Sequence, residues 1–287
     1  MRLEIQGLQF MLKKSLFTVL LFSAFSRPEA SELVLYGPLS QGALVIGEVI
    51  DKGSADASVF LNGERIRVSS EGNFVIGFGR DAAIEQHLEL NVAGKTVETR
   101  LLNLSQRQYE TQRVEGVPQE TVTPKPEKLA RIRAEAALVS AARRKMLALN
   151  FFQQPFVAPM ERPVTGVYGS QRVYNGTPKR PHYGVDYAAP IGAVVHAPAS
   201  GIVTLRHDDM YYSGGTLIID HGYGVSSTFI HLSEILVNEG DSIRQGDAIA
   251  KVGQGGRATG PHLDWRMNWF KVRIDPQLVL KIDLPER

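Results

Sequence analysis

The chain has 287 residues, of which 43% are hydrophobic and 22% charged, so it has the composition of a folded protein with about two domains. Its formal net charge is +2, and residues 1–30 alone carry four basic and two acidic side chains. The remainder is therefore balanced and lacks the positive field that nucleic-acid-binding proteins use. The absence of cysteine excludes disulfides, cysteine nucleophiles and thiolate metal sites.

Residues 1–30 are typical of a signal peptide. Lys13 and Lys14 precede a short apolar run, Leu16–Phe25, and small residues follow near position 30. The run is too short to span a bilayer, and no later segment is long and apolar enough to do so. We expect an exported, periplasmic or secreted protein that is not an integral membrane protein; Met11 is a plausible alternative start. The competing interpretation of this run is a buried core helix.

Residues 31–105 predict a small β-sandwich-like domain. Apolar or alternating runs occur at Val34–Tyr36, Ala43–Ile50 and Ser58–Val68. Asn62-Gly63 lies between apolar residues and indicates a hairpin turn. No cluster of chemically reactive residues occurs here, so we interpret the domain as a spacer or binding module.

Residues 106–150 predict a linker followed by one helix. Residues 106–128 are rich in Gln, Glu, Thr and Pro, as linkers are. Apolar residues then recur at helical spacing, which predicts an apolar stripe that docks on a neighbouring domain. The stripe comprises Leu129, Ile132, Ala136, Val139 and Met146. The other face is basic and is interpreted as solvated, with contact to an anionic polymer or membrane as the alternative. It carries Arg131, Arg133, Arg143, Arg144 and Lys145.

Residues 151–287 predict an antiparallel β domain with long loops. Short β-rich runs alternate with glycine turns from residue 194 to residue 267. There is no GxGxxG, phosphate-binding loop or GxSxG motif, so the sequence does not support a nucleotide site or a serine hydrolase.

Two pairs of polar residues predict a metal site in this domain. His182 and Asp186 are four residues apart and share a face if the segment is extended. Strand alternation also places His262 and Asp264 on one side and Leu263 and Trp265 on the other. A catalytic zinc takes three protein ligands and leaves one position for water, whose pKa it lowers toward neutrality.

The other histidines differ in their context. His231 would share a strand face with Phe229 and would be structural if it were alone, but a proton carrier is needed beside a metal site. His196, in a strand, His207, in an expected loop, and His221, at a glycine turn, are interpreted as structural residues.

The motifs together resemble the lysostaphin-type zinc metallopeptidases, which are cell-wall endopeptidases with an antiparallel β core. The resemblance covers roughly residues 163–277. It rests on His182-Tyr-Gly-Val-Asp186, Ala197–Gly201, Asp220–Gly224, Ile230–Ser233 and Thr259–Leu263. It implies that His182 and Asp186 are zinc ligands, and that His231 and His262 are catalytic, one as base and the other steadying the intermediate or protonating the leaving amine.

One departure from the family concerns the third ligand. The usual motif is His-x-His, whereas this chain has Asp264 at the second position. Aspartate is a zinc ligand through oxygen, although a harder oxygen ligand relaxes selectivity among divalent ions. A smaller departure is Gly255, where the family often has Ser or Thr.

The sequence therefore predicts an exported zinc endopeptidase that hydrolyses peptide bonds of peptidoglycan with metal-activated water. The alternative is a catalytically inactive relative that acts as a cell-wall binding module or amidase activator. A lipoyl- or biotin-type carrier has little support, because Lys251 lies within an apolar run instead of at a hairpin tip.

Overall fold

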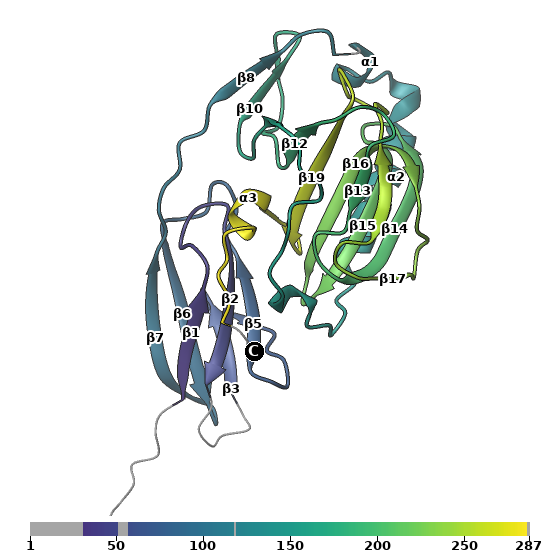
Figure 1. Ribbon diagram of the computed structural model, residues 1–287. Coiled ribbons are helices and arrows are strands. Elements are labelled where there is room, and N and C mark those ends of the chain that lie inside the picture. Colours follow the sequence, from purple (N-terminus) through teal and green to yellow (C-terminus); the bar gives the residue numbers. More distant parts are fainter. Residues whose placement is uncertain (1–30, 51–56, 118, 286–287) are drawn as a thin grey trace, which may run out of the picture.

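The computed structural model describes residues 31–50, 57–117 and 119–285. The predicted signal peptide, residues 1–30, lies outside these ranges. The described chain forms two β-rich parts that lie side by side and are joined by one long segment leading to strand β8 (Figure 1). Within the described ranges, no helix is long and apolar enough to cross a membrane. The predicted fold class, mostly antiparallel β with few helices, is confirmed.

The first part is a sandwich of two antiparallel sheets. One sheet has the order β1-β2-β5 and the other β4-β3-β6-β7. Alternate residues of both sheets, such as Val45, Phe74, Val59 and Leu88, are fully buried and form one shared core. The strands are β1 (Glu32–Tyr36), β2 (Leu44–Ile50), β3 (Ala57–Leu61), β4 (Glu64–Ile66), β5 (Asn73–Gly77), β6 (Glu85–Val92) and β7 (Lys95–Asn103).

The predicted hairpin turn between β3 and β4 is present. Asn62 and Gly63 both have positive φ, 51° and 79°. A two-residue turn of this kind matches the twist of the flanking strands, and asparagine and glycine tolerate it best.

The segment predicted as a linker contains more structure than expected. Strand β8 (Thr111–Val114) pairs in parallel with β10 (Gln171–Tyr174) of the second part. A helical turn α1 (Gln119–Val122) and a 3₁₀ turn (Pro126–Lys128) follow. Composition identified a polar, proline-containing segment, but it could not reveal a strand partner some 60 residues away in sequence.

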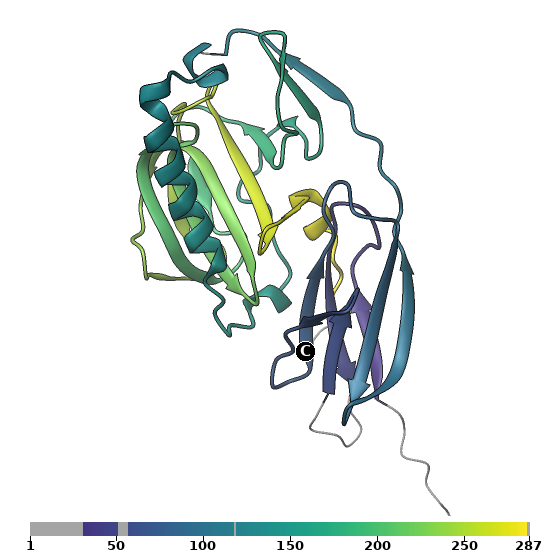
Figure 2. The ribbon, with the colours of Figure 1, turned by 180° about the vertical axis from the view of Figure 1, so that it is seen from behind.

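The predicted helix is present as α2 (Leu129–Arg144) and lies across one face of the larger sheet (Figure 2). Val139 and Ala142 pack there against Leu205, Met210 and Ile218. Part of the predicted stripe does not dock, because Leu129 is 38% exposed. The basic face is not uniformly solvated either, since Arg143 is half-buried and donates a hydrogen bond to Thr228.

The second part is built on a ten-stranded sheet whose main path is β17-β14-β15-β16-β19-β12-β9. Helix α3 (Pro276–Val279) follows it, and a 3₁₀ turn (Phe151–Gln153) precedes it. The ten strands of this sheet are β9 (Val164–Gly166), β12 (Val185–Ala188), β13 (Val194–His196), β14 (Gly201–Met210), β15 (Gly214–Gly222), β16 (Val225–Ile235), β17 (Ser242–Ile243), β18 (Ala248–Val252), β19 (His262–Trp269) and β20 (Val272–Ile274). Strand β11 (Thr177–Pro178) pairs instead with β10 in the small sheet that contains β8. Strands β13 to β19 lie largely within residues 194–267, where β-rich runs were predicted, and β14 extends through the loop expected at His207.

The two faces of this sheet have different chemistry. Leu217, Phe229 and Trp265 are register partners across β15, β16 and β19, and all are fully buried in the main core. The opposite face carries Asp264 and Arg266, and helix α2 covers its far end. Strand alternation thus separates a hydrophobic layer from a polar layer.

The two parts pack through an apolar contact. Leu44 and Ile46 of β2 and Val75 of β5 join the same core cluster as Ile274 and Val279 of the second part. At the edge of this contact, Arg107 and the buried Asp275 form an ion pair of 2.7 Å.

Asp220 makes stability depend on pH. The residue is 2% exposed, its carboxylate accepts a hydrogen bond from the Gly222 backbone N–H at 2.7 Å, and burial raises its pKa to about 6. Because the folded-state pKa exceeds the unfolded value, the native protein binds the extra proton. Stability is therefore full below about pH 4 and falls as the pH rises to about 6.

We predict that Asp220→Asn removes this dependence. The amide stays neutral, so the variant should be more stable than the parent by about 3 kcal/mol at pH 7.5 and equal to it near pH 4. Urea denaturation from pH 4 to pH 8 measures the difference. Parallel stability profiles for the two proteins would contradict the assignment.

Candidate metal centre

Two carboxylates face each other across neighbouring strands at the centre of the site. Asp186 of β12 and Asp264 of β19 are register partners in an antiparallel pair. Their side chains are 10% and 4% exposed. Two buried like charges in direct opposition are unfavourable unless cations balance them.

Two glycines allow the backbone to approach these carboxylates. A Cβ atom on Gly166 would overlap the Asp186 carboxylate, and one on Gly184 would overlap Oδ1 of Asp264. Gly166 pairs with Asp186 across β9 and β12. Any larger residue at either position would displace the carboxylate beside it.

His182 completes the group, and its Nε2 atom points between the two carboxylates. Nε2 lies 3.0 Å from Oδ1 of Asp186 and 3.2 Å from Oδ2 of Asp264. Nδ1 contacts the Val167 carbonyl oxygen at 3.2 Å. A carbonyl only accepts, so Nδ1 carries a proton, and Nε2 is free to bind a second proton or a metal ion.

The electrostatics of the group favour a cation at its centre. Burial alone opposes charge on His182, but Asp264 and Asp186 together raise its pKa. Burial likewise opposes ionisation of Asp264, yet Arg266 and His182 hold its pKa well below the usual range. For Asp186, His182 and Arg172 outweigh burial and the repulsion from Asp264, and its pKa is lowered.

The donor set fits a divalent metal ion. One ligand atom from each of His182, Asp186 and Asp264 lies within 4.8 Å of the other two. Oδ1 of Asp186 is buried and lies 3.0 Å from Nε2 of His182, with no other hydrogen-bond partner among the described residues, so it is available as a ligand. One imidazole nitrogen and two carboxylate oxygens suit zinc, with an oxygen-rich character that also accommodates harder ions.

His231 and His262 lie beside this group. Their ring centroids are 4.7 Å apart. Nδ1 of His231 contacts the Gly255 carbonyl at 2.7 Å, and Nδ1 of His262 contacts the Gly260 carbonyl at 2.8 Å. By the argument used for His182, each Nδ1 is protonated and each Nε2 presents a lone pair. Burial lowers the pKa of His231 to about 4, so its ring is neutral at pH 7.

The expectation that His231 shares a face with Phe229 is wrong. Phe229 lies in the main core, whereas His231 lines the metal-centre cavity with Asp264 and His262. The cause is the backbone at His231, whose φ of 64° is left-handed and interrupts the alternation of β16. Such a conformation costs a non-glycine residue about 1–3 kcal/mol and is often found at functional sites.

The three other histidines of this part make backbone hydrogen bonds away from the metal centre. His221 is fully buried, with Nδ1 2.7 Å from the Ser200 carbonyl and Nε2 2.8 Å from the Ser227 hydroxyl. Nδ1 of the exposed His196 contacts the Gly246 carbonyl. His207 accepts a hydrogen bond from the Asp209 N–H, and it lies in β14, not in the expected loop.

Sequence reasoning missed the arginines that hold the carboxylates. Arg172 donates to Oδ2 of Asp186 at 2.8 Å, and Nη2 of Arg266 donates to Oδ2 of Asp264 at 2.6 Å. The spacing of Asp264 and Arg266 in a strand could have indicated their pair. The Arg172 pair, and the position of Gln112 and Val114 at the cavity, depend on the unexpected β8–β10 pairing.

Comparisons with known proteins identify the family that this part of the chain resembles. The sequence pattern described as Peptidase family M23 matches residues 180–276. The chain is 40% identical over 107 residues to peptidoglycan DD-endopeptidase ShyB of Vibrio cholerae, which covers 37% of this chain and 24% of ShyB. It is 43% identical over 100 residues to DD-carboxypeptidase/endopeptidase Mpg of Neisseria meningitidis, covering 35% of this chain and 22% of Mpg. The matches thus span about a quarter of these relatives.

A structural comparison extends over more of the chain. The crystal structure of a candidate M23 peptidase from Pseudomonas aeruginosa is similar with a TM-score of 0.65 and 28% identity, covering 84% of this chain and 95% of that one. The structural match covers 84% of the chain, which is more than residues 180–276 alone, so it includes regions outside the segment that matches the family pattern.

We predict distinct effects for substitutions of Asp264. Asp264→Ala should abolish stoichiometric binding of a divalent ion, because one of three ligands is lost. Asp264→His should retain zinc but lower the melting temperature, because Arg266 loses its partner and stays partly buried. Adding Arg266→Gln to the histidine variant should recover that temperature.

Elemental analysis after gel filtration and thermal unfolding measure these effects. Asp208→Ala, which alters an exposed carboxylate elsewhere, is the matched control. Full metal occupancy in Asp264→Ala would show that Asp264 is not a ligand.

Proposed function

Because residues 180–276 form a domain of peptidase family M23, we propose that this protein is a zinc-dependent endopeptidase that cleaves peptide bonds of peptidoglycan. One observation carries the proposal: ligand atoms of His182, Asp186 and Asp264 converge within 4.8 Å, beside two further histidines. The peptidoglycan substrate is proposed from the activities in the names of ShyB and Mpg.

The proposed division of labour begins with the ligands. His182, Asp186 and Asp264 would hold the ion, and Arg172 and Arg266 would keep the two carboxylates ionised and oriented. When bound, zinc lowers the pKa of a coordinated water and polarises the carbonyl under attack. Gly166 and Gly184 leave the carboxylates room to take their positions.

The two histidines would have separate roles, His262 in proton transfer and His231 in hydrogen bonding to the reacting groups. Nε2 of His262 lies 3.9 Å from Oδ1 of Asp186, and its 19% exposed side chain can exchange protons with solvent, unlike the buried ring of His231. His262 is therefore the better general base and would return the proton to the leaving amine. The buried, neutral ring of His231 would accept a hydrogen bond at Nε2 and orient the reacting groups.

We also propose that the protein is exported. The support is the composition of residues 1–30 and the location of peptidoglycan outside the cytoplasmic membrane. The alternative of a non-catalytic amidase activator is less well supported, because such a role needs neither the three converging ligand atoms nor the adjacent histidine pair.

Digestion of purified peptidoglycan tests the function. We expect the protein to release uncross-linked muropeptides, to lose this activity after treatment with a chelator, and to regain it with zinc. Mass spectrometry of the products identifies the bond cleaved. No cleavage with any divalent ion, despite one bound ion per chain, would contradict the enzymatic proposal.

Substitution of the histidine pair separates catalysis from metal binding. His231→Ala and His262→Ala should each lower the turnover number about 100-fold or more while retaining one metal ion per chain. His196→Ala is the control, since its exposed ring lies outside the metal-centre cavity. If either site variant kept full turnover, its proposed role would be wrong.

A further inference from the structure

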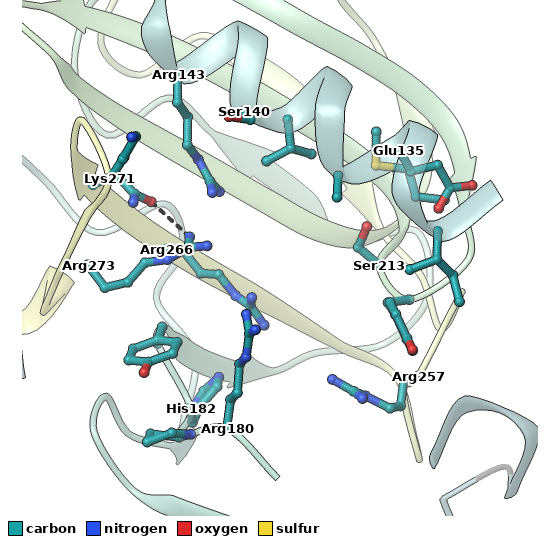
Figure 3. A pocket seen from close by; sticks show the side chains of 18 of the residues that line it. Glu135, Ser140, Arg143, Arg180, His182, Ser213, Arg257, Arg266, Lys271 and Arg273 are labelled. Carbon is teal, nitrogen blue, oxygen red and sulfur yellow. Dashed lines mark hydrogen bonds between the residues drawn. The ribbon is translucent and has the colours of Figure 1, made fainter. Parts of the chain in front are cut away.

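A cavity of about 1230 Å³ lies next to the metal centre, between helix α2 and the polar face of the large sheet (Figure 3). We call it the arginine cavity. Residues of α2, such as Val139 and Arg143, line one side, and Arg266 and Arg273 line the other. His182 and Arg266 border both this cavity and that of the metal centre, so the two spaces adjoin.

The lining of the arginine cavity is strongly cationic. It includes the eight basic side chains Arg143, Arg144, Lys179, Arg180, Arg257, Arg266, Lys271 and Arg273. The acidic lining residue is Glu135, whose carboxylate is engaged by Arg131 at 2.6 Å and by the Tyr211 N–H at 2.8 Å. Figure 3 shows side chains of Arg143, Arg180, Arg257 and Arg273 directed toward the same space.

Five of the six lining arginines have no carboxylate partner among the described residues, and Arg143, Arg273 and Arg257 make other contacts. Arg143 donates to the Thr228 hydroxyl at 2.9 Å, but its buried Nε has no hydrogen-bond acceptor. Arg273 donates to the Asn268 side-chain oxygen at 3.1 Å. Arg257 lies over an aromatic ring, that of Tyr212, at 4.8 Å. Buried cations without an anionic partner are costly.

These cations also disfavour one another. Burial, followed by the charges of Arg273 and Arg266, lowers the pKa of Arg143 well below its usual value. Burial and Arg266 lower the pKa of Arg273 to about 10. An anionic ligand would relieve this repulsion and supply the missing acceptors. Apolar residues such as Ile132 and Val139 could cover the aliphatic parts of such a ligand.

We propose that the arginine cavity binds free carboxylates of the peptide substrate while the scissile bond lies at the metal centre. This inference rests on the proposed function. The adjacency of the two cavities favours an extended peptide, and the basic groups come from separate segments, with Arg143 on α2, Arg257 in the β18–β19 loop and Arg273 on β20. That spread suits several carboxylates along a chain better than one compact phosphate.

Direct binding to the metal-free full-length protein tests the proposal independently of catalysis. The probes are acetyl-Ala-Glu-Glu-Ala, with three carboxylates, and the uncharged acetyl-Ala-Gln-Gln-Ala-amide. Metal and chelator are removed by dialysis before calorimetry. We expect the acidic peptide to bind about tenfold or more tightly than its twin at 50 mM salt, with the difference shrinking at 0.5 M.

Variants locate the binding. Arg143→Gln and Arg273→Gln should each weaken binding of the acidic peptide about fivefold or more, with little effect on the amide twin. Each should also melt at the same or a higher temperature, because mutual repulsion is reduced, so weaker binding cannot be ascribed to unfolding. Arg133→Gln, an exposed position on α2 outside the cavity, should bind as the parent does.

Three outcomes would overturn the proposal. They are equal binding of the two peptides, unchanged binding in both cavity variants, and Arg143-dependent binding of pyrophosphate without binding of the acidic peptide. The last would indicate an oxyanion site of another class. The binding assay uses metal-free protein and does not depend on peptidase activity. Loss of the proposed enzymatic function would therefore appear in the digestion assay, and failure of the carboxylate-binding proposal would appear in the binding assay.

Discussion

The opposed carboxylates of Asp186 and Asp264 are the constraint on which the rest of the site depends. Adjacent strands hold the two carboxylates in register, and burial keeps out the water that would otherwise screen the repulsion between them. Arg172, Arg266 and His182 surround the pair, and the open oxygen of Asp186 faces the imidazole nitrogen. A divalent ion held by His182, Asp186 and Asp264, as proposed above, would sit between these acceptors and keep one position for water.

The sheet supports this arrangement by separating its two faces. On one face, Phe229, Trp265 and their neighbours form the hydrophobic core that packs β12, β16 and β19 together. On the other face the same strands present Asp264 and Arg266, so precise placement of polar groups is a consequence of apolar packing behind them. The left-handed backbone of His231 is the exception, since it turns the His231 ring to the polar face.

The segments outside the matched domain contribute to the same face. Strand β8 supports β10, which carries Arg172, and helix α2 closes the arginine cavity over the sheet. The sandwich domain contacts the opposite end of the second part through β2 and β5, with the Arg107–Asp275 ion pair at its edge. The metal centre therefore lies among elements from several parts of the chain, while the sandwich packs away from it.

The sequence by itself determined the class of fold, most strands, the helix and the five candidate residues, because period-two patterns, glycine turns and separated motifs are local features. It also indicated that Asp264 and His262 share a strand. Only the tertiary structure decided which cations neutralise the carboxylates, that residues 106–128 include a strand beside the site, and that His231 leaves the alternation of β16. It also decided that Arg143 turns toward a cavity. Each of these depends on contacts between residues distant in sequence or on a backbone angle, and neither composition nor periodicity encodes such features.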